Sequence, residues 1–190
     1  DEGFTRVLRD LTVALAERRV VELVYESGVY DASRPDRRVR LRPYAIEPSA
    51  NTRALYVIGY DEERQDRRTF KVERIKSTSL TPESFEAPDD SVAREMLEAW
   101  DVISDAEPVE VLVRFDPSVT QRVHETRWHA SQVEELEDDG SLIWRTRVSG
   151  VLEIRSWLLS WGPDAEVLEP PELRAWVAEQ HAAAAARYDD

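Results

Sequence analysis

The first part of the chain changes from a helical to an alternating pattern of apolar and polar residues. Apolar side chains recur at helical spacing over residues 4–18, which predicts an amphipathic helix. The short apolar or alternating segments that follow predict strands at residues 20–27, 38–48, 54–60, 67–75 and 77–80. A helix followed by about five short strands with tight connections is typical of a small SH3-like barrel.

Two of these strands place arginines in regular positions. In residues 38–48, the set Arg38, Arg40 and Arg42 alternates with Val39 and Leu41, which predicts one polar face. This face is either the solvated side of an edge strand, which protects against aggregation, or a track for a ligand. In the second case Arg42 is the best candidate.

Residues 67–75 read RRTFKVERI, and as a strand they would place arginines among apolar side chains. Period-2 alternation puts Arg68, Phe70, Val72 and Arg74 on one face. The two arginines then either pair with carboxylates such as Glu47 or Glu73, or form a guanidinium clamp for a phosphate. The planar fork of arginine favours the clamp, because it can make bidentate contacts with an anion.

Aromatic residues near these arginines suggest a second kind of contact. Tyr56 and Phe70 are core or rim aromatics by default, but beside arginines they could stack on a base. An anionic, nucleic-acid-like ligand would use both kinds of side chain.

The rest of the chain begins with a proline-containing linker at residues 82–90 and a predicted connecting helix at residues 91–103. The next segments alternate in type: strand 109–115, helix 116–127, strands 128–137 and 141–149, helix 151–161, strand 165–170, and a helix from Pro171 to about Arg187. This order is a ferredoxin-like plan with an added helix. The predicted fold class is therefore α+β, with domains at residues 1–81 and 108–190 joined by residues 82–107. Four tryptophans are expected in the core of the second domain: Trp128, Trp144, Trp157 and Trp161.

Charge is distributed unevenly between these domains. Residues 1–81 hold 16 Lys+Arg against 14 Asp+Glu, a net charge of +2, whereas residues 82–190 hold 9 against 25, a net charge of −16. Because a phosphate backbone would be repelled by the second half, an anion site belongs in the first. No apolar run reaches the ~18 residues of a membrane span, so we expect no membrane partner. The only methionine is Met96, and we expect the chain to be a fragment whose N-terminal neighbour is missing.

Residues with catalytic or metal-binding potential are sparse. Cysteine is absent, which excludes thiolate metal sites and cysteine nucleophiles. His124 and His129 are five residues apart, about 140° around a helix, whereas zinc ligation from one helix needs a spacing of four. With no glycine-rich phosphate loop or serine nucleophile motif, we expect no catalytic residues, no metal and no cofactor, and an enzyme acting on nucleotides is the least favoured alternative.

Several short motifs together resemble the WYL domain of bacterial transcriptional regulators. The triplet that names the domain falls on Leu55, Tyr56 and Val57, where only the tyrosine is identical. The later motif R-x-F-x-x-x-R-I matches at Arg68, Phe70, Arg74 and Ile75, and the RPY segment at 42–44 resembles the entry to the preceding strand. The second half resembles the WCX extension of this family, in VLVRFDPSVTQRV, the Trp128–His129 pair, WLLSWG and VLEPPELR.

The resemblance implies an Sm-like barrel and a ferredoxin-like domain behind an N-terminal winged-helix DNA-binding domain. Such proteins are cytoplasmic regulators, commonly homodimers, that sense nucleotides or single-stranded nucleic acid. Carried over to this chain, the ligand-binding residues are Arg42, Tyr44, Tyr56, Arg68, Phe70 and Arg74. The alternative is a protein–protein interaction scaffold without a small ligand.

Overall fold

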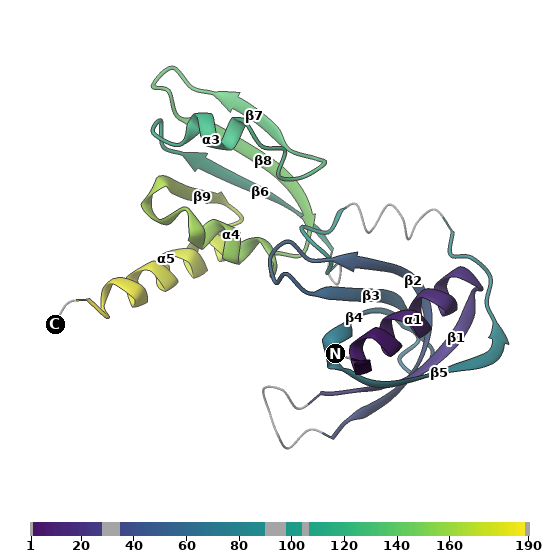
Figure 1. The fold of residues 1–190 in the computed structure, drawn as a ribbon. Coiled ribbons are helices and arrows are strands. Elements are labelled where there is room, and N and C mark those ends of the chain that lie inside the picture. The colour runs from purple at the N-terminus through teal and green to yellow at the C-terminus, as the bar shows by residue number, and fades with distance from the viewer. Residues whose placement is uncertain (1, 28–34, 90–97, 104–106, 189–190) are drawn as a thin grey trace. The chain divides into compact units, whose positions relative to one another are not determined.

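The computed structural model describes residues 2–27, 35–89, 98–103 and 107–188 (Figure 1). The chain divides into two compact units, Asp1–Val92 and Ala93–Asp190. Each unit contains an antiparallel sheet and at least one helix. The predicted α+β class is therefore confirmed.

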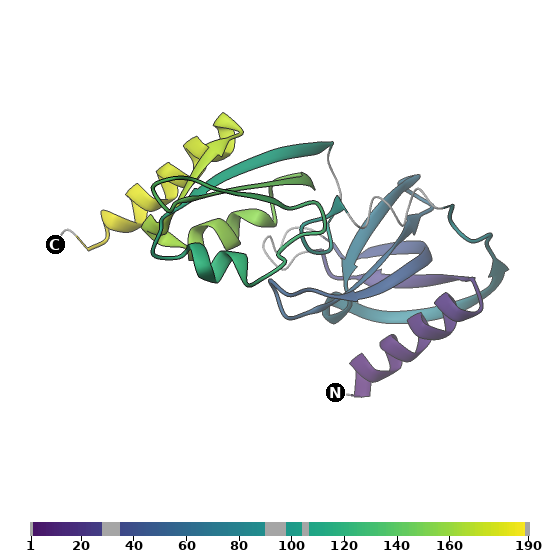
Figure 2. The same cartoon turned by 90° about the horizontal axis from the view of Figure 1, so that it is seen from above.

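The first unit is a helix followed by a five-stranded sheet. Its elements are α1 (Glu2–Ala16), β1 (Arg19–Tyr25), β2 (Arg37–Pro48), β3 (Leu55–Asp61), β4 (Asp66–Lys71), the 3₁₀ helix η1 (Val72–Arg74) and β5 (Ile75–Ser84). The strand order is β4-β3-β2-β1-β5, and α1 packs on β1, β2 and β5 (Figure 2). Among the described strands, β4 and β5 form the two edges, so the predicted small barrel is not closed.

Alternation along β2 separates a core side from an outer side, as the sequence predicts. Val39 and Leu41 are fully buried, and they join Val7 and Leu11 of α1 in one apolar cluster. We call this side of the sheet the inner face. Arg38, by contrast, is exposed on the opposite side, which we call the outer face.

The predicted strand at residues 67–75 is wrong in its second half. β4 ends at Lys71, and the chain turns through η1 before β5 begins at Ile75. Val72 and Ile75 are both buried, and their spacing of three matches the three residues per turn of a 3₁₀ helix. Strand alternation therefore does not extend to Arg74.

The second unit contains a four-stranded antiparallel sheet, and the α-helices α3, α4 and α5 lie in its described part. Its elements are β6 (Pro108–Phe115), α3 (Thr120–His124), β7 (Val133–Leu136), β8 (Leu142–Ser149), α4 (Ile154–Ser160), the 3₁₀ helix η2 (Gly162–Asp164), β9 (Ala165–Glu169) and α5 (Pro171–Ala185). The strand order is β7-β8-β6-β9. Strands and α-helices thus follow one another in the predicted order.

Tryptophans form much of the core of the second unit. Trp144, Trp157 and Trp161 are buried, and Trp128 packs against the same cluster. The ring centroids of Trp144 and Trp157 are 5.0 Å apart, and those of Trp157 and Trp161 are 5.8 Å apart. The predicted core role of these four residues is confirmed.

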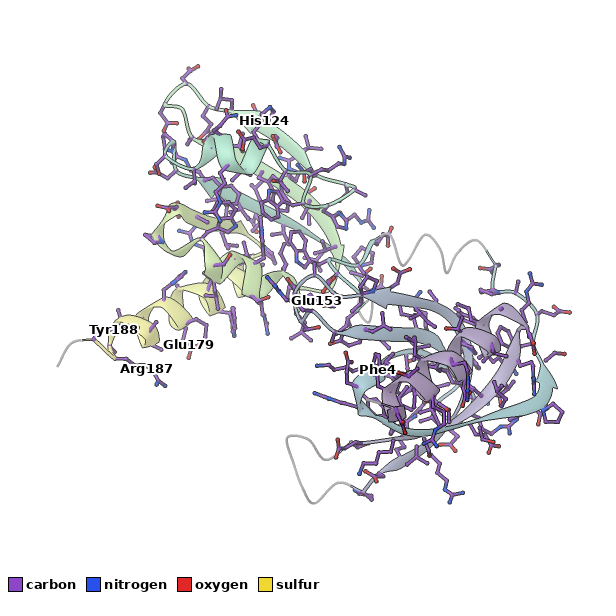
Figure 3. The ribbon with its side chains drawn as sticks, viewed as in Figure 1. Phe4, His124, Glu153, Glu179, Arg187 and Tyr188 are labelled. Carbon is purple, nitrogen blue, oxygen red and sulfur yellow. The ribbon has the colours of Figure 1, made fainter. Side chains whose placement is uncertain are left out.

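One carboxylate attaches residues 98–103 to this unit. Oxygen atoms of Glu153, at the start of α4 (Figure 3), accept hydrogen bonds from the backbone N–H groups of Asp101, Val102 and Ile103 at 3.0 Å. The ring of Trp100 lies 4.9 Å from that of Trp157. The predicted connecting helix at 91–103 otherwise lies mostly outside the described residues.

Replacing Glu153 by alanine should therefore destabilise the second unit. The substitution leaves three half-buried N–H groups without their acceptor, and we expect the free energy of unfolding to fall by about 1–3 kcal/mol. Urea denaturation followed by tryptophan fluorescence measures this. Glu179→Ala, which removes an exposed carboxylate from α5 (Figure 3), is the control, and an equal loss in both variants would contradict the role given to Glu153.

Candidate ligand-binding face

Arg42 lies on the outer face of β2, where an aromatic ring and a carboxylate hold it. Its guanidinium carbon is 5.5 Å from the ring centroid of Tyr60, the residue paired with it on β3. Its Nε donates to Oε1 of Glu62 at 2.8 Å. The Arg42 side chain nevertheless remains 42% exposed, so an anion could still reach it.

The strands approach closely beside this residue because of Gly59. A Cβ atom at this position would lie 2.4 Å from the carbonyl oxygen of Arg42, a distance that real Cβ atoms do not adopt. Gly59 pairs with Pro43, and the register shifts between Pro43 and Ala45. The glycine thus allows the pairing that sets Arg42 opposite Tyr60.

Tyr44 is half-buried two residues further along β2. Its ring centroid is 6.0 Å from that of Phe85, with the two planes tilted by 58°. Burial raises the pKa of the Tyr44 hydroxyl, although the positive charge of Arg42 opposes this. The hydroxyl therefore stays protonated near neutral pH and can donate a hydrogen bond.

Tyr56 lies on the same face of β3 as Tyr60, but away from Arg42. The two tyrosines are four positions apart, which corresponds to about 13 Å along a strand. The Tyr56 hydroxyl is 3.1 Å from Oγ1 of Thr52. Tyr56 therefore belongs to the outer face without joining the group around Arg42.

Only Arg68 and Phe70 of the R-x-F-x-x-x-R motif share a strand face as predicted. Arg68 pairs with Gly59 across β3 and β4, so it projects from the inner face. Its side chain is 47% exposed and forms an ion pair with Asp66 at 3.0 Å. Arg74 lies in η1 rather than on β4. The predicted clamp thus loses the shared strand face on which it depended.

Phe70 is a core residue rather than a surface for stacking. It is 3% exposed, and its ring packs edge-on to Tyr25 with centroids 5.1 Å apart. A base could not reach this ring in the described structure. The predicted stacking role of Phe70 is therefore wrong.

Arg40 carries a contact network that the sequence does not reveal. Its Nε donates to Glu62 at 3.0 Å, its Nη1 to Glu22 at 2.8 Å and its Nη2 to Glu83 at 2.7 Å. These hydrogen bonds raise the pKa of Arg40, that of Glu62 contributing most. Although burial opposes it, the bonds from Arg42 and Arg40 lower the pKa of Glu62. Alternation along β2 places Arg40 on the outer face, but it cannot identify the carboxylates from three other segments of the chain that bind it.

A hollow of about 330 Å³ opens on the outer face beside Arg40. Its walls include Val24, Arg38, Glu63 and the neighbouring serines Ser77 and Ser79. Among the described residues, no carboxylate forms an ion pair with Arg38. On the outer face of β2, the guanidinium of Arg38 thus lies on the same side as those of Arg40 and Arg42, which carboxylates hold.

A second pair missed by the sequence reasoning lies on the inner face. Asp61 is fully buried and forms an ion pair with Arg37, whose guanidinium carbon is 5.9 Å from the ring centroid of Phe70. Oδ1 of Asp61 also accepts hydrogen bonds from the backbone N–H groups of Glu63 and Arg64, at 3.1 and 3.2 Å. These contacts occupy both carboxylate oxygens of Asp61, so we assign the pair a structural role and not a ligand-binding one.

In the part of the chain that the structure describes, no group of three or more His, Asp or Glu side chains is arranged to hold a metal ion. None of the described helices is both long and apolar enough to cross a membrane.

Comparisons with known proteins identify both units. The family described as WYL domain matches residues 6–80, and the family described as WCX domain matches residues 107–185. A comparison with curated protein sequences gives no match.

Two solved structures resemble the chain at low identity. A CRISPR Cas-related protein is 13% identical with a TM-score of 0.64, over 98% of this chain and 53% of that one. Proteasome accessory factor B/C (PafBC) of Arthrobacter aurescens is 20% identical with a TM-score of 0.43, over 97% of this chain and 28% of that one. This chain therefore spans about half or less of the length of either protein.

Proposed function

This chain belongs to the proteins that combine a WYL domain with a WCX domain, and we propose that it is the ligand-sensing region of a bacterial transcriptional regulator. The family resemblance supports this role. An attached DNA-binding domain would respond to a ligand bound by the WYL unit. Within this proposal the protein is cytoplasmic, has no cofactor and is not an enzyme.

We also propose that the two units are variants of the Sm-like and ferredoxin-like folds. In the first unit, a helix packs on a five-stranded antiparallel sheet. In the second, the strand order β7-β8-β6-β9 with helices after β6 and β8 agrees with a ferredoxin-like arrangement.

The proposed ligand is a nucleotide or a single-stranded nucleic acid, bound on the outer face. The observation that supports this most is Arg42, which is partly exposed over the Tyr60 ring and whose charge acts on the nearby Tyr44 hydroxyl. Arginine can contact a phosphate through two nitrogen atoms, and an aromatic ring can stack on a base for about 1–3 kcal/mol. Arg38 adds a second guanidinium on the same strand face.

A second candidate function is a protein interaction scaffold without a small ligand. The carboxylates around Arg40 and Arg42 favour it, because they already neutralise these two outer-face arginines. In that case the ion pairs of the outer face would stabilise the fold and would not bind a ligand.

Homodimer formation remains part of the proposal and rests on the family resemblance. The apolar helical faces of Trp100/Ile103 and Trp176/Val177 would be surfaces for a second copy. In the structure Val177 is buried, and both tryptophans pack against the core of their own unit. These residues therefore give no separate support for a dimer.

Titration of the chain with a fluorescently labelled oligothymidylate at two salt concentrations tests the sensor against the scaffold. We expect saturable binding that weakens steeply with salt, because each phosphate contact on a single strand contributes about −0.7 to the slope of log K against log salt. Absence of binding to both the oligonucleotide and mononucleotides would overturn the sensor and leave the scaffold.

A further inference from the structure

An acidic segment of the chain itself lies against the proposed ligand site. Residues 83–89, which we call the exit segment, leave the end of β5 and read ESFEAPD. Glu83 accepts a hydrogen bond from Nη2 of Arg40, and the ring of Phe85 lies beside that of Tyr44. Asp89 is close enough to act on the charge state of the Tyr44 hydroxyl. The segment therefore follows the outer face over several residues.

The backbone holds the start of this segment in place. The register of β5 against β1 shifts between the pairs Val21–Leu80 and Arg19–Ser84. Within the shifted stretch, Oγ1 of Thr81 donates to the carbonyl oxygen of Val20 at 2.8 Å. Beyond it, the N–H group of Phe85 donates to the carbonyl oxygen of Arg18 at 2.9 Å. A bulge of this kind redirects side chains, and here Glu83 reaches Arg40 on the outer face.

The side chains of the exit segment match the chemistry of the proposed ligand. The Glu83 carboxylate occupies a guanidinium nitrogen that a phosphate would use, and the Phe85 ring lies where a base could pack on Tyr44. All three guanidinium nitrogens of Arg40 are engaged by carboxylates. Three of the five N–H donors of Arg40 are thus used by carboxylates, and a phosphate that approaches Arg40 competes with them for its positive charge.

Glu83 is better placed to leave Arg40 than Glu62 is. Its side chain is 59% exposed, and it lies on the edge strand β5. Glu62, by comparison, is 20% exposed and accepts hydrogen bonds from both Arg40 and Arg42. Exposed ion pairs contribute little to stability, so exchange of Glu83 for a phosphate costs little.

We propose that the exit segment is an internal competitor, in which Glu83 and Phe85 occupy the outer face as substitutes for a phosphate and a base. This inference rests on the proposed ligand-binding function and adds its regulation. A ligand can then bind only as Glu83 and Phe85 leave the outer face. The exit segment therefore changes its contacts when the site is occupied. The apparent affinity is reduced by the fraction of molecules in which the segment covers the site.

The double variant Glu83→Gln/Phe85→Ala tests this competition. We expect it to bind labelled oligothymidylate about tenfold more tightly than the parent chain, since an exposed ion pair and an aromatic contact each account for a few-fold effect. Glu86→Gln is the matched control, because it removes the same charge from an exposed residue of the same segment. We expect it to change the affinity by less than about twofold, as a remote surface charge does.

The outcomes separate the competitor from the binding function. Equal affinities for the parent, the double variant and the control would overturn the competitor while leaving the binding function intact. If no variant binds, both proposals fail. Hydrogen exchange gives an independent measurement: oligonucleotide binding should speed exchange in residues 83–89 of the parent chain, and unchanged or slower exchange there would also contradict displacement.

Discussion

Arg37→Ala is expected to destabilise the first unit by about 3–5 kcal/mol, because it leaves a buried carboxylate without its partner. Asp61 is 0% exposed, and its ion pair with Arg37 lies against the core ring of Phe70. Urea unfolding followed by far-ultraviolet circular dichroism measures the loss. Arg38→Ala removes the same charge from the next residue of β2, which is exposed, and should cost less than about 0.5 kcal/mol.

A second variant separates lost charge balance from lost packing. In Arg37→Leu/Asp61→Asn both charges are removed, and the new amide side chain would still offer an oxygen to the backbone N–H groups of Glu63 and Arg64. We expect most of the stability to return, since a buried ion pair replaced on both sides is often nearly neutral. If the double variant is as unstable as Arg37→Ala, the contribution of Arg37 is packing rather than charge compensation.

Arg42→Ala is expected to weaken oligonucleotide binding about 10- to 100-fold, the effect of losing a hydrogen bond to a charged group. Without Arg42, the negative charge of Glu62 also has one positive partner fewer and repels an incoming phosphate more strongly. Equilibrium titration at several salt concentrations should show a slope of log K against log salt that is smaller by about 0.7, corresponding to one contact.

Arg68→Ala provides the charge-matched control for this experiment. It removes one guanidinium from the inner face, where Arg68 pairs with Asp66. We expect a change in affinity of less than about threefold and an unaltered salt slope. A larger effect for Arg68→Ala than for Arg42→Ala would place the ligand on the inner side of β4 and overturn the outer-face site.

The pattern of apolar and polar residues predicted the helices and strands well wherever one periodicity, helical or alternating, runs through the whole element. The helix α1 and the two-sided strand β2 follow directly from spacing, because each buries one face against a common core. The prediction failed at residues 72–74 for a physical reason. In the 3₁₀ helix η1, Val72 and the following Ile75 both point to the core at a spacing of three, and a short apolar sequence does not distinguish this from a strand.

Site residues were predicted only as far as the strand face to which they belong. Alternation identified the outer face through Arg38, Arg40 and Arg42, but it could not show that Arg40 meets carboxylates from three distant segments. The net charge of +2 for residues 1–81 is a sum, and it does not show that carboxylates neutralise Arg40 and Arg42 locally. Arg37 and Asp61 were missed because a buried ion pair joins residues that are adjacent only after β2 and β3 have paired.

The placement of the tryptophans gives the protein an internal optical reporter. All six lie between Trp100 and Trp176, in the second unit, and the first unit contains none. Selective excitation of indole therefore observes the WCX unit alone, while a ligand on the proposed outer face would bind to the WYL unit, which contains no indole. A change in emission upon ligand addition would be a signal carried from one unit to the other, obtained without attaching a dye.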